Sequence, residues 1–470
     1  MAFIIFLTLA ITIFFILIFR IITSSPGSKL PPGKTGWPIL GENLSFMVNP
    51  AKFISDRMKK YSANIFQTSL AGAKMSIFCG ASGNKFIYSN ESKFKTWLPP
   101  TLVDVLSLTN IDSTSSPWKL FDEQLHKFLR LESMQHYVPI MDTKVREHLE
   151  KHWAPFNQVK VLPLSKEFTI SLFCNLILKI YDSDQIKELA KPYHTLVKGI
   201  ISVPLNLPGT PYNHAVKASK LIRDKLVELV RQRKMEVLEK KDHVNVDDVD
   251  FLGGLLRASI EGGDFISEME LVGKIVALLF AAFHTTSNTI TFLMAHLAEY
   301  PDVYEKVLQE QLEIAQSKEK GEILNWKDIQ KMKYSWNVVC ETMRLKPPAL
   351  GGFREASTDI HYGGYTVPKG WKVHWSVYST HIDPVHFSEP ERFDPSRFEE
   401  KQGRGVYVPF GLGPHMCCGR EYARIKVLVF LHNVVTRFRL SKANPNERVI
   451  YTPDPVFVDG LRINLCSQKE

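Results

Sequence analysis

The sequence predicts a mainly α-helical fold with a small β-rich subdomain. Apolar residues recur with the 3.6-residue spacing of helices through most of residues 102–399. Residues 39–95 instead mix short β-like runs, such as 75–79, with helical stretches, such as 51–61. One predicted helix in the second half is long enough to cross a whole domain. These three observations favour one large helical domain with a β-rich part near its N-terminal end.

The composition is that of a folded globular protein. The chain has 470 residues, of which 44% are hydrophobic, 11% aromatic and 23% charged, and its formal net charge is +9. The charge is not concentrated as in a nucleic-acid-binding protein, so nucleic acid is not an expected partner, whereas an anionic membrane or an acidic protein is compatible. Six scattered cysteines do not form a disulfide framework, which suits a reducing compartment.

The N-terminus reads as a membrane anchor. Residues 2–19 carry no charge and would form about 27 Å of helix, enough to span a bilayer core. Positive charge begins only at Arg20, so residues 1–22 are predicted to be a single transmembrane anchor with the following chain in the cytosol. A cleaved signal peptide is the alternative, but the positive segment that precedes the apolar run in such peptides is missing. Residues 23–38 are predicted to form a proline-rich connector, and residues 39–470 the main folded domain.

The long helix has a clear start and stop. Ser267 and Glu270 have the spacing of a capping box, and Pro301 ends the pattern after about 34 residues, or roughly 50 Å. Its middle contains Ala281 and, four residues later, Thr285. A helical threonine commonly bonds back to its own helix, and that interpretation stays open beside a functional one.

Two charged motifs follow. Glu341 and Arg344 lie three residues apart on a predicted helix, so an ion pair is expected. Residues 390–393 read Pro-Glu-Arg-Phe and contribute Arg392. Arg354 lies between the two motifs; it could bind a carboxylate or be a plain surface charge.

Cys417 lies in a Gly- and Pro-rich loop, residues 409–419, directly before a predicted helix over 420–438. The glycines let the backbone approach a flat cofactor and turn its amides toward the sulfur. The helix N-terminus and these amides favour the thiolate, the form that ligates haem iron. The alternative is a buried structural cysteine in a turn.

Together these features resemble microsomal cytochromes P450 over essentially the whole chain. The loop is similar to the haem-binding signature Phe-x-x-Gly-x-x-x-Cys-x-Gly, and residues 281–287 resemble the oxygen-activation motif. Residues 31–41, 78–86 and 373–376 look closer to plant P450s that oxidise triterpenoids, diterpenoids and sterols.

The resemblance implies a P450 fold with haem b between the long helix and the Cys417 helix. The implied activity is hydroxylation or further oxidation of an apolar terpenoid or sterol-like substrate with O2. Electrons from NADPH would arrive through NADPH–cytochrome P450 reductase, docked on the basic face around Arg420, Arg424 and Lys426. The implied location is the endoplasmic reticulum membrane.

The resemblance also assigns roles to residues. The implied iron ligand is Cys417. The implied haem contacts are Phe410, Gly411, Gly413, His415, Gly419 and Arg354. The implied proton-delivering residues are Thr285, His284 and Thr286. The implied buried ion-pair triad is Glu341, Arg344 and Arg392. The implied substrate pocket consists of Phe280, Ala281, Phe283, Leu350, Phe353, Val456 and Phe457.

Three departures from the family pattern matter. His284 stands where the family usually has an acid, and His415 where it usually has an arginine. Residues 118–123 are acidic where a basic haem contact is common. If His284 is an impaired proton relay, an aspartate there would couple NADPH use more tightly to product. Two other functions therefore stay open: a P450-fold enzyme that rearranges or dehydrates its substrate without full oxygen activation, and a non-catalytic membrane haem-binding accessory protein.

Overall fold

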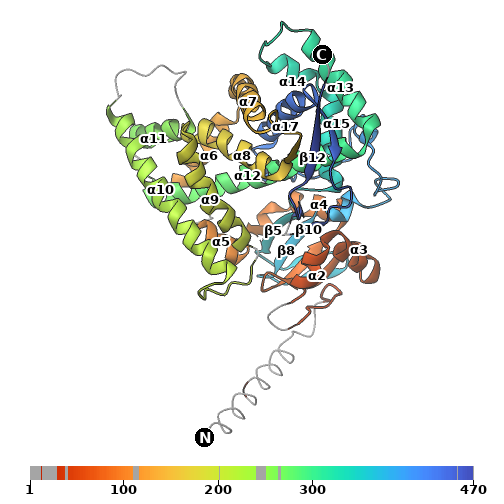
Figure 1. Ribbon diagram of the computed structural model, residues 1–470. Helices are drawn as coiled ribbons and strands as arrows, with labels where there is room; N and C mark the ends of the chain where they lie inside the picture. The colour runs from red at the N-terminus through yellow and green to blue at the C-terminus, as the bar shows by residue number, and fades with distance from the viewer. Residues whose placement is uncertain are drawn as a thin grey trace.

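The computed structural model describes Thr12 and residues 29–37, 41–108, 116–200, 202–239, 250–262, 266–451 and 454–468. The predicted anchor, residues 1–22, lies outside the described residues apart from Thr12, as does much of the predicted connector. In the described part, a large helical body lies beside a smaller part built on β-strands (Figure 1). The predicted mainly helical architecture with a small β-rich subdomain is confirmed.

The described α-helices are α2 (Asn43–Val48), α3 (Pro50–Lys60), α4 (Gly80–Ser89), α5 (Pro100–Leu106), α6 (Ser116–Phe128), α7 (Leu131–His152), α8 (Val161–Phe173), α9 (Ser183–Ile200), α10 (Pro211–Glu239), α11 (Phe251–Gly262), α12 (Glu268–Glu299), α13 (Pro301–Gln316), α14 (Trp326–Lys331), α15 (Lys333–Leu345), α16 (Tyr378–His381) and α17 (Arg420–Val435). Short 3-10 turns cover Glu91–Lys93, Pro395–Phe398 and Gly413–His415, and a π-helical turn, Cys174–Leu178, extends α8.

The strands form four described sheets. The largest has the order β1 (Ile65–Leu70), β2 (Ala73–Phe78), β8 (Lys372–Ser376), β5 (Gly351–Ala356) and β3 (Phe94–Thr96). The smaller sheets contain β4 (Gln158–Lys160), β12 (Arg462–Ser467) and β9 (Phe438–Lys442); β10 (Val449–Tyr451) and β11 (Pro455–Phe457); and β6 (Ile360–Tyr362) and β7 (Tyr365–Val367). The β-like run predicted at 75–79 lies mostly in β2, which is the parallel neighbour of β8, with Phe78 opposite Trp375.

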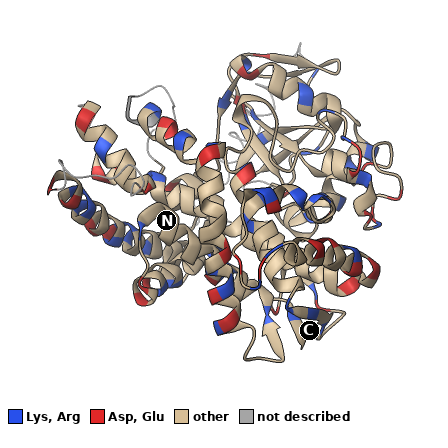
Figure 2. Cartoon of the chain, turned by 90° about the horizontal axis from the view of Figure 1, so that it is seen from above, with Lys and Arg blue, Asp and Glu red and all other residues tan. Residues whose placement is uncertain are grey.

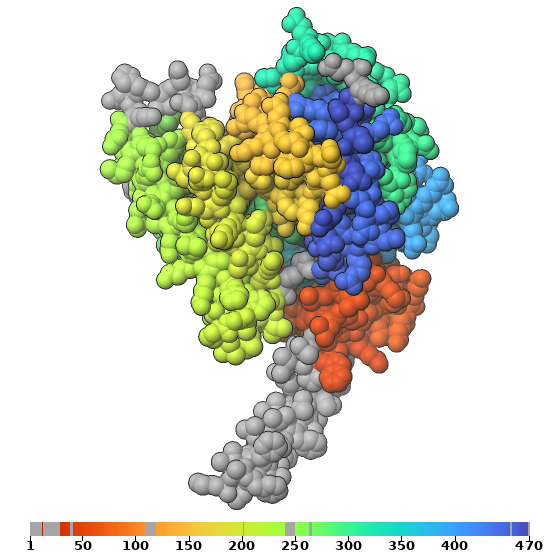
Figure 3. Space-filling model, viewed as in Figure 1, coloured from red at the N-terminus to blue at the C-terminus, as the bar shows by residue number. Residues whose placement is uncertain are grey.

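Two hydrophobic cores hold the structure together. The larger joins α5 to α15 and α17 with β4, β9 and β12. The smaller fills the space between the five-stranded sheet and α3, α4 and α16. In the space-filling view the N-terminal part of the described chain lies directly beneath C-terminal segments (Figure 3). Residues far apart in the sequence therefore meet where the two cores adjoin.

The long helix predicted from its capping residues is α12. Ser267 is its N-cap, and the side-chain oxygen of Ser267 accepts a hydrogen bond from the backbone N–H of Glu270 at 3.3 Å. The helix passes through the helical body and contacts α8, α10, α15 and α17 (Figure 1). Its residues beyond Phe283 are buried almost continuously, so it serves as the axis of the larger core.

Charged residues of both signs are interspersed along the outer helices, whereas the central helices are mostly uncharged (Figure 2). Two described helices, Val161–Leu178 and Glu268–Glu299, are long and apolar enough to cross a membrane by length and composition. Most of each apolar segment is buried within the protein, with 72% and 56% of the residues inside, as expected of core helices.

Candidate active site

The cysteine loop lies where the two cores meet. Val408 and Leu412 pack with the β-rich core, whereas Phe410 packs against the helical core. The loop closes on itself because the backbone N–H of Cys417 donates to the carbonyl oxygen of Phe410 at 2.8 Å. Gly411 has a positive φ of 75°, and a Cβ there would lie 3.1 Å from the Tyr88 hydroxyl oxygen. Only glycine fits this turn without strain.

Cys417 itself is exposed, although the loop sits between two cores. Burial of the surroundings raises the pKa of its thiol to about 11, and the neighbouring Cys418 adds to this. The backbone N–H of Gly419 acts in the opposite direction, but more weakly. The backbone amide therefore acts in the direction expected from the sequence, and a bound metal cation would favour the thiolate further.

One face of α12 opens in its middle. Ala281 is exposed and Phe280 and Thr285 are half-buried, although the residues around them are buried. The Thr285 hydroxyl donates to the Ala281 carbonyl oxygen at 2.8 Å, which is the back-bond common for helical threonine. Thr286 is only 4% exposed, because each residue turns the helix by about 100° and takes its side chain off the open face. The role of Thr286 in proton delivery stays a prediction.

His284 faces the C-terminal segment. Its Nε2 lies 3.2 Å from the Oδ2 of Asp454, and both side chains are nearly buried. One turn later, the Asn288 amide donates to the Pro455 carbonyl oxygen at 3.4 Å. A further turn along, the ring centroids of Phe292 and Phe457 are 4.8 Å apart. We call this line of contacts the α12 seam; it fixes the β10–β11 region against α12.

Sequence reasoning missed Asp454. It follows two residues outside the described ranges, and its partner His284 is 170 positions earlier in the chain. No local pattern links positions so far apart. The seam also places His284 beside a carboxylate, so the acid missing from the helix itself is present on the facing segment.

Glu341 and Arg344 form the predicted ion pair, and both side chains are fully buried. Arg344 Nε donates to Glu341 Oε2 at 2.6 Å and Nη2 donates to Oε1 at 2.8 Å. The remaining guanidinium hydrogens reach the carbonyl oxygens of His381, Pro390 and Arg392. Every donor of this buried cation therefore has an acceptor, which such a charge requires.

The predicted third member of this network, Arg392, is wrong. Arg392 gives only its carbonyl oxygen to Arg344; its side chain is 65% exposed and pairs with Glu389. Arg397, 11% exposed, instead brings its Nε within 3.5 Å of Glu341 Oε1. The same Pro-x-Arg-Phe pattern recurs at residues 395–398, and this second copy was the available signal. Only folding shows which arginine turns inward.

His381 connects this network to the cysteine loop. Its carbonyl oxygen accepts from Arg344 Nη1 at 2.7 Å, and its ring Nε2 accepts the backbone N–H of Val408 at 3.0 Å. Burial, together with the charge of Arg344, lowers the pKa of His381 to about 3. The ring therefore stays neutral at physiological pH and keeps Nε2 free to accept. The buried ion pair and the loop position are thus mechanically linked.

The remaining predicted residues divide into two groups. Phe353 and Val456 are half-buried like Phe280, and Leu350 is 9% exposed. Phe283, in contrast, is 1% exposed and packs edge-on against the Tyr193 ring at 5.1 Å, so it belongs to the core and not to the open face. Phe457 likewise packs on Phe292 in the α12 seam. Phe283 and Phe457 thus pack with core side chains, and the assignment of the seven residues to a substrate pocket stays a prediction.

The predicted basic docking face also needs correction. Arg420 is exposed and Arg424 is half-buried in a pair with Glu421. Lys426, however, is only 1% exposed, and its Nζ donates to the Ala282 carbonyl oxygen of α12 at 3.1 Å. It therefore cannot contact a partner protein.

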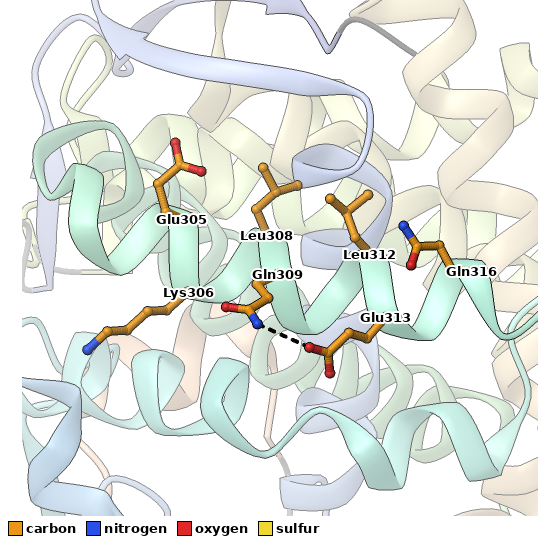
Figure 4. Close-up of a pocket in the computed structure, with 7 residues that line it drawn as sticks. All are labelled: Glu305, Lys306, Leu308, Gln309, Leu312, Glu313 and Gln316. Carbon is orange, nitrogen blue, oxygen red and sulfur yellow. Dashed lines mark hydrogen bonds between the residues drawn. The ribbon is translucent and has the colours of Figure 1, made fainter.

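A hollow of about 420 Å³ lies on the outer face of α13 (Figure 4). All its labelled residues come from this one helix, among them Gln309 and Glu313, which are joined by a 3.2 Å hydrogen bond. None of them belongs to the cysteine loop or to the open face of α12, and an outer helix surface does not enclose a substrate. We assign it no part in the active site.

Comparisons with known proteins match this geometry. Residues 31–458 match the model of the family Cytochrome P450. The chain belongs to the cytochrome P450 family. It is 48% identical to a beta-amyrin 6-beta-monooxygenase of Solanum lycopersicum, over 93% of each chain. It is 44% identical to a beta-amyrin 28-monooxygenase of Panax ginseng, over 95% of this chain and 94% of that one.

The fold of this P450 is also that of a solved structure described as retinoic acid bound cyanobacterial CYP120A1. The TM-score is 0.83, with 28% identity, and the match covers 94% of this chain and 100% of the other. As a P450 monooxygenase, the protein uses haem with a cysteine-thiolate ligand, and a redox partner supplies the electrons.

The residues present fit a haem. Cys417 is exposed, and Gly419 leaves space beside its sulfur, which a Cβ at that position would approach to 3.8 Å. The Lys426–Ala282 bond joins the Cys417 helix to the open turn of α12. Only about 9 Å of helix separates Lys426 from Arg420 at the start of α17.

Arg354 and His415 have free capacity for the haem carboxylates. Among the described residues, no carboxylate lies within ion-pair distance of Arg354, whose Nη1 bonds only to the Phe353 carbonyl oxygen. His415 is 53% exposed and its Nε2 lies 3.9 Å from Glu91 Oε2. A propionate near Arg354 would supply the anion that this guanidinium lacks.

The two arginines of the 389–397 segment give a matched test. Arg397→Ala should destabilise the fold by about 1–3 kcal/mol, because the buried Glu341 carboxylate loses the Arg397 guanidinium that lies beside it. Arg392→Ala should stay within about 0.5 kcal/mol, because its ion pair is exposed. Denaturant midpoints of both variants check this. An Arg392→Ala effect equal to that of Arg397→Ala would contradict the assignment.

If His284 and Asp454 interact in the α12 seam, swapping the two residues should preserve their interaction. His284→Asp would place two carboxylates face to face and should cost about 2–3 kcal/mol. The double variant His284→Asp/Asp454→His should recover most of this loss. NADPH consumed per product should rise in the single variant, contrary to the impaired-relay hypothesis. Asp459→His, at an exposed position of the same segment, is the control; a double variant no better than the single one would refute the seam.

Proposed function

We propose that this P450 oxidises an unactivated carbon of a triterpenoid of the beta-amyrin type. The observation that carries the proposal is the similarity to two beta-amyrin monooxygenases, 48% and 44% identical over more than nine-tenths of the chain. Four of the apolar side chains that the family resemblance assigns to the pocket, Phe280, Leu350, Phe353 and Val456, suit a rigid hydrocarbon skeleton.

We further propose how the residues divide the work. Cys417 is the axial ligand, and the bound haem supplies the oxidising chemistry. Ala281 presents no side chain beyond a methyl group, so oxygen and substrate can approach α12 closely. Thr285, held by its bond to the Ala281 carbonyl oxygen, keeps a hydroxyl at the same face. His284 acts through the seam, holding Asp454 and the β10–β11 segment over this face.

We infer that the redox partner is NADPH–cytochrome P450 reductase and that the protein is anchored in the endoplasmic reticulum membrane. The uncharged run of residues 2–19, followed by Arg20, supports a single-pass anchor over residues 1–22 with the rest in the cytosol. Residues 23–38 then act as the connector and residues 39–470 as the haem-thiolate catalytic domain. Arg420 remains available for docking, whereas Lys426 does not.

The position of oxidation depends on side chains and not on overall similarity. The two relatives are described as acting on the same compound at different carbons, although they are almost equally similar to this chain. Identity therefore narrows the substrate class without choosing the carbon. The half-buried residues Phe353 and Val456, which come from β5 and β11, are the side chains most able to make that choice.

Co-expression with a plant reductase in cells that make beta-amyrin tests the proposal. A product heavier by one oxygen atom, formed with equimolar use of NADPH and O2, is expected. Product formed without either would instead indicate a rearrangement, and the absence of any product from a panel of triterpenoid skeletons would overturn the assignment of substrate class. NMR of the product locates the new hydroxyl. Its position shows whether this protein oxidises the same carbon as one of the two relatives.

The ligand assignment has a spectroscopic test. Cys417→Ser should abolish the red-shifted band of the reduced CO complex, because a serine hydroxyl does not replace the thiolate. Cys418→Ser, at the adjacent position, should retain it. If Cys418→Ser lost the band and Cys417→Ser kept it, the two cysteines would have to exchange roles.

A further inference from the structure

Lys426 is a buried amine that the reaction as described does not use. It lies in the second turn of α17, is 1% exposed, and donates from Nζ to the Ala282 carbonyl oxygen at 3.1 Å. The ammonium also lies 4.7 Å from the ring centre of Tyr422 on the same helix. Among the described residues it has no carboxylate within ion-pair distance. A lysine is seldom fully buried without such a partner.

The bond partner of Lys426 lies in the turn that opens toward the haem side. The Thr285 hydroxyl takes the carbonyl oxygen of Ala281, and Lys426 takes that of Ala282. Two consecutive peptide carbonyls of α12 are therefore each bonded to a side chain, one from within the helix and one from α17. Because α17 follows directly after Cys417, the amine joins the proposed ligand helix to the turn that carries Thr285.

The strength of this bond depends on charge. A protonated amine makes a charge-assisted hydrogen bond, which is about twice as strong as a neutral one. Burial alone lowers the pKa of Lys426 to about 7, so its charge changes near neutral pH. The phenol of Tyr422 on α17 lies against the amine, and Tyr137 on α7 lies close enough to Tyr422 to affect it. Burial raises the pKa of both phenols, so they stay neutral over this pH range.

We propose that Lys426 is a positioning residue, which holds the Ala281–Thr285 turn of α12 against the Cys417 helix and holds it more tightly when charged. The inference rests on the proposed monooxygenase reaction. On this proposal, the Thr285 hydroxyl keeps its position on the haem-facing side of α12 while the amine is protonated. As pH rises through neutral the bond weakens, and a larger share of the electrons is lost as hydrogen peroxide.

The experiment compares three variants of the full-length, haem-loaded protein with the unaltered enzyme. Lys426→Met keeps the bulk but removes the donor, and Lys426→Gln keeps a donor without charge. Lys274→Met removes a second buried lysine, on α12, which lies over the Phe121 ring and whose pKa burial lowers to about 8. Hydrogen peroxide released per NADPH is measured with reductase and beta-amyrin between about pH 6 and about pH 9.

The unaltered enzyme and Lys274→Met should lose coupling by about three- to tenfold as pH rises through neutral. Lys426→Met should be poorly coupled at every pH, and Lys426→Gln intermediate, with neither showing the transition. A transition that persists unchanged in both Lys426 variants would overturn the proposal. Lys426→Gln keeps a donor but has no charge. If this variant were fully coupled at every pH while Lys426→Met were poorly coupled, the donor alone would be sufficient and the role of the charge would be overturned.

Thermal unfolding gives a readout that needs no substrate. A depressed folded-state pKa means that the unfolded chain binds an extra proton between about pH 7 and about pH 10, so stability rises with pH over this window. The melting temperature of Lys426→Met, measured relative to the unaltered enzyme, should therefore be highest at or below neutral pH and decline toward pH 10. If beta-amyrin gives no product but this trend appears, the substrate proposal fails. The conclusion that Lys426 is buried and titrates in the folded protein is then retained. A pH-independent difference would show that Lys426 does not titrate in the folded state.

Discussion

The buried pair of Glu341 and Arg344 is the constraint on which the site depends. A guanidinium without solvent must find an acceptor for each of its five hydrogens, and Arg344 finds them on three separate chain segments. This requirement fixes α15, α16 and the 389–397 segment in one arrangement. Through the neutral ring of His381, the same arrangement sets the backbone at Val408, where the cysteine loop begins. The position of the Cys417 loop therefore depends in part on the hydrogen bonds of the buried Arg344, which reach the loop through His381.

The second constraint is the way α12 is held. The α12 seam fixes the helix to the β10–β11 segment, and Lys426 fixes it to α17. Both attachments, at Ala282 and from His284 onward, fall within or directly after the turn with Ala281 and Thr285, where the helix is left open. An oxidation site needs a helix that does not move, because a shift of one ångström at the reacting atoms costs rate. Here that rigidity comes from two polar contacts, His284 with Asp454 and Lys426 with the Ala282 carbonyl oxygen. The family resemblance predicted neither contact.

Both cases show buried polar groups used for position. Isolated, such groups cost free energy, and replacing them with apolar residues is often neutral or stabilising. Their directional bonds, however, define one register between segments, whereas apolar contacts tolerate sliding. The protein places them where two cores adjoin and a flat cofactor must fit between.

Much of this was readable from sequence. Periodicity and caps gave α12, with Ser267 at its start, and the Gly-rich loop before α17 pointed to Cys417, because backbone conformation at these places depends on neighbouring residues. The pairing of Glu341 with Arg344 followed from their spacing on one helix turn. Local pattern could not decide which of two Pro-x-Arg-Phe arginines turns inward, that Phe283 packs into the core, or that Lys426 is buried. Nor could it bring Asp454 to His284. These depend on contacts between segments far apart in the chain, and only the tertiary structure brings such segments within bonding distance.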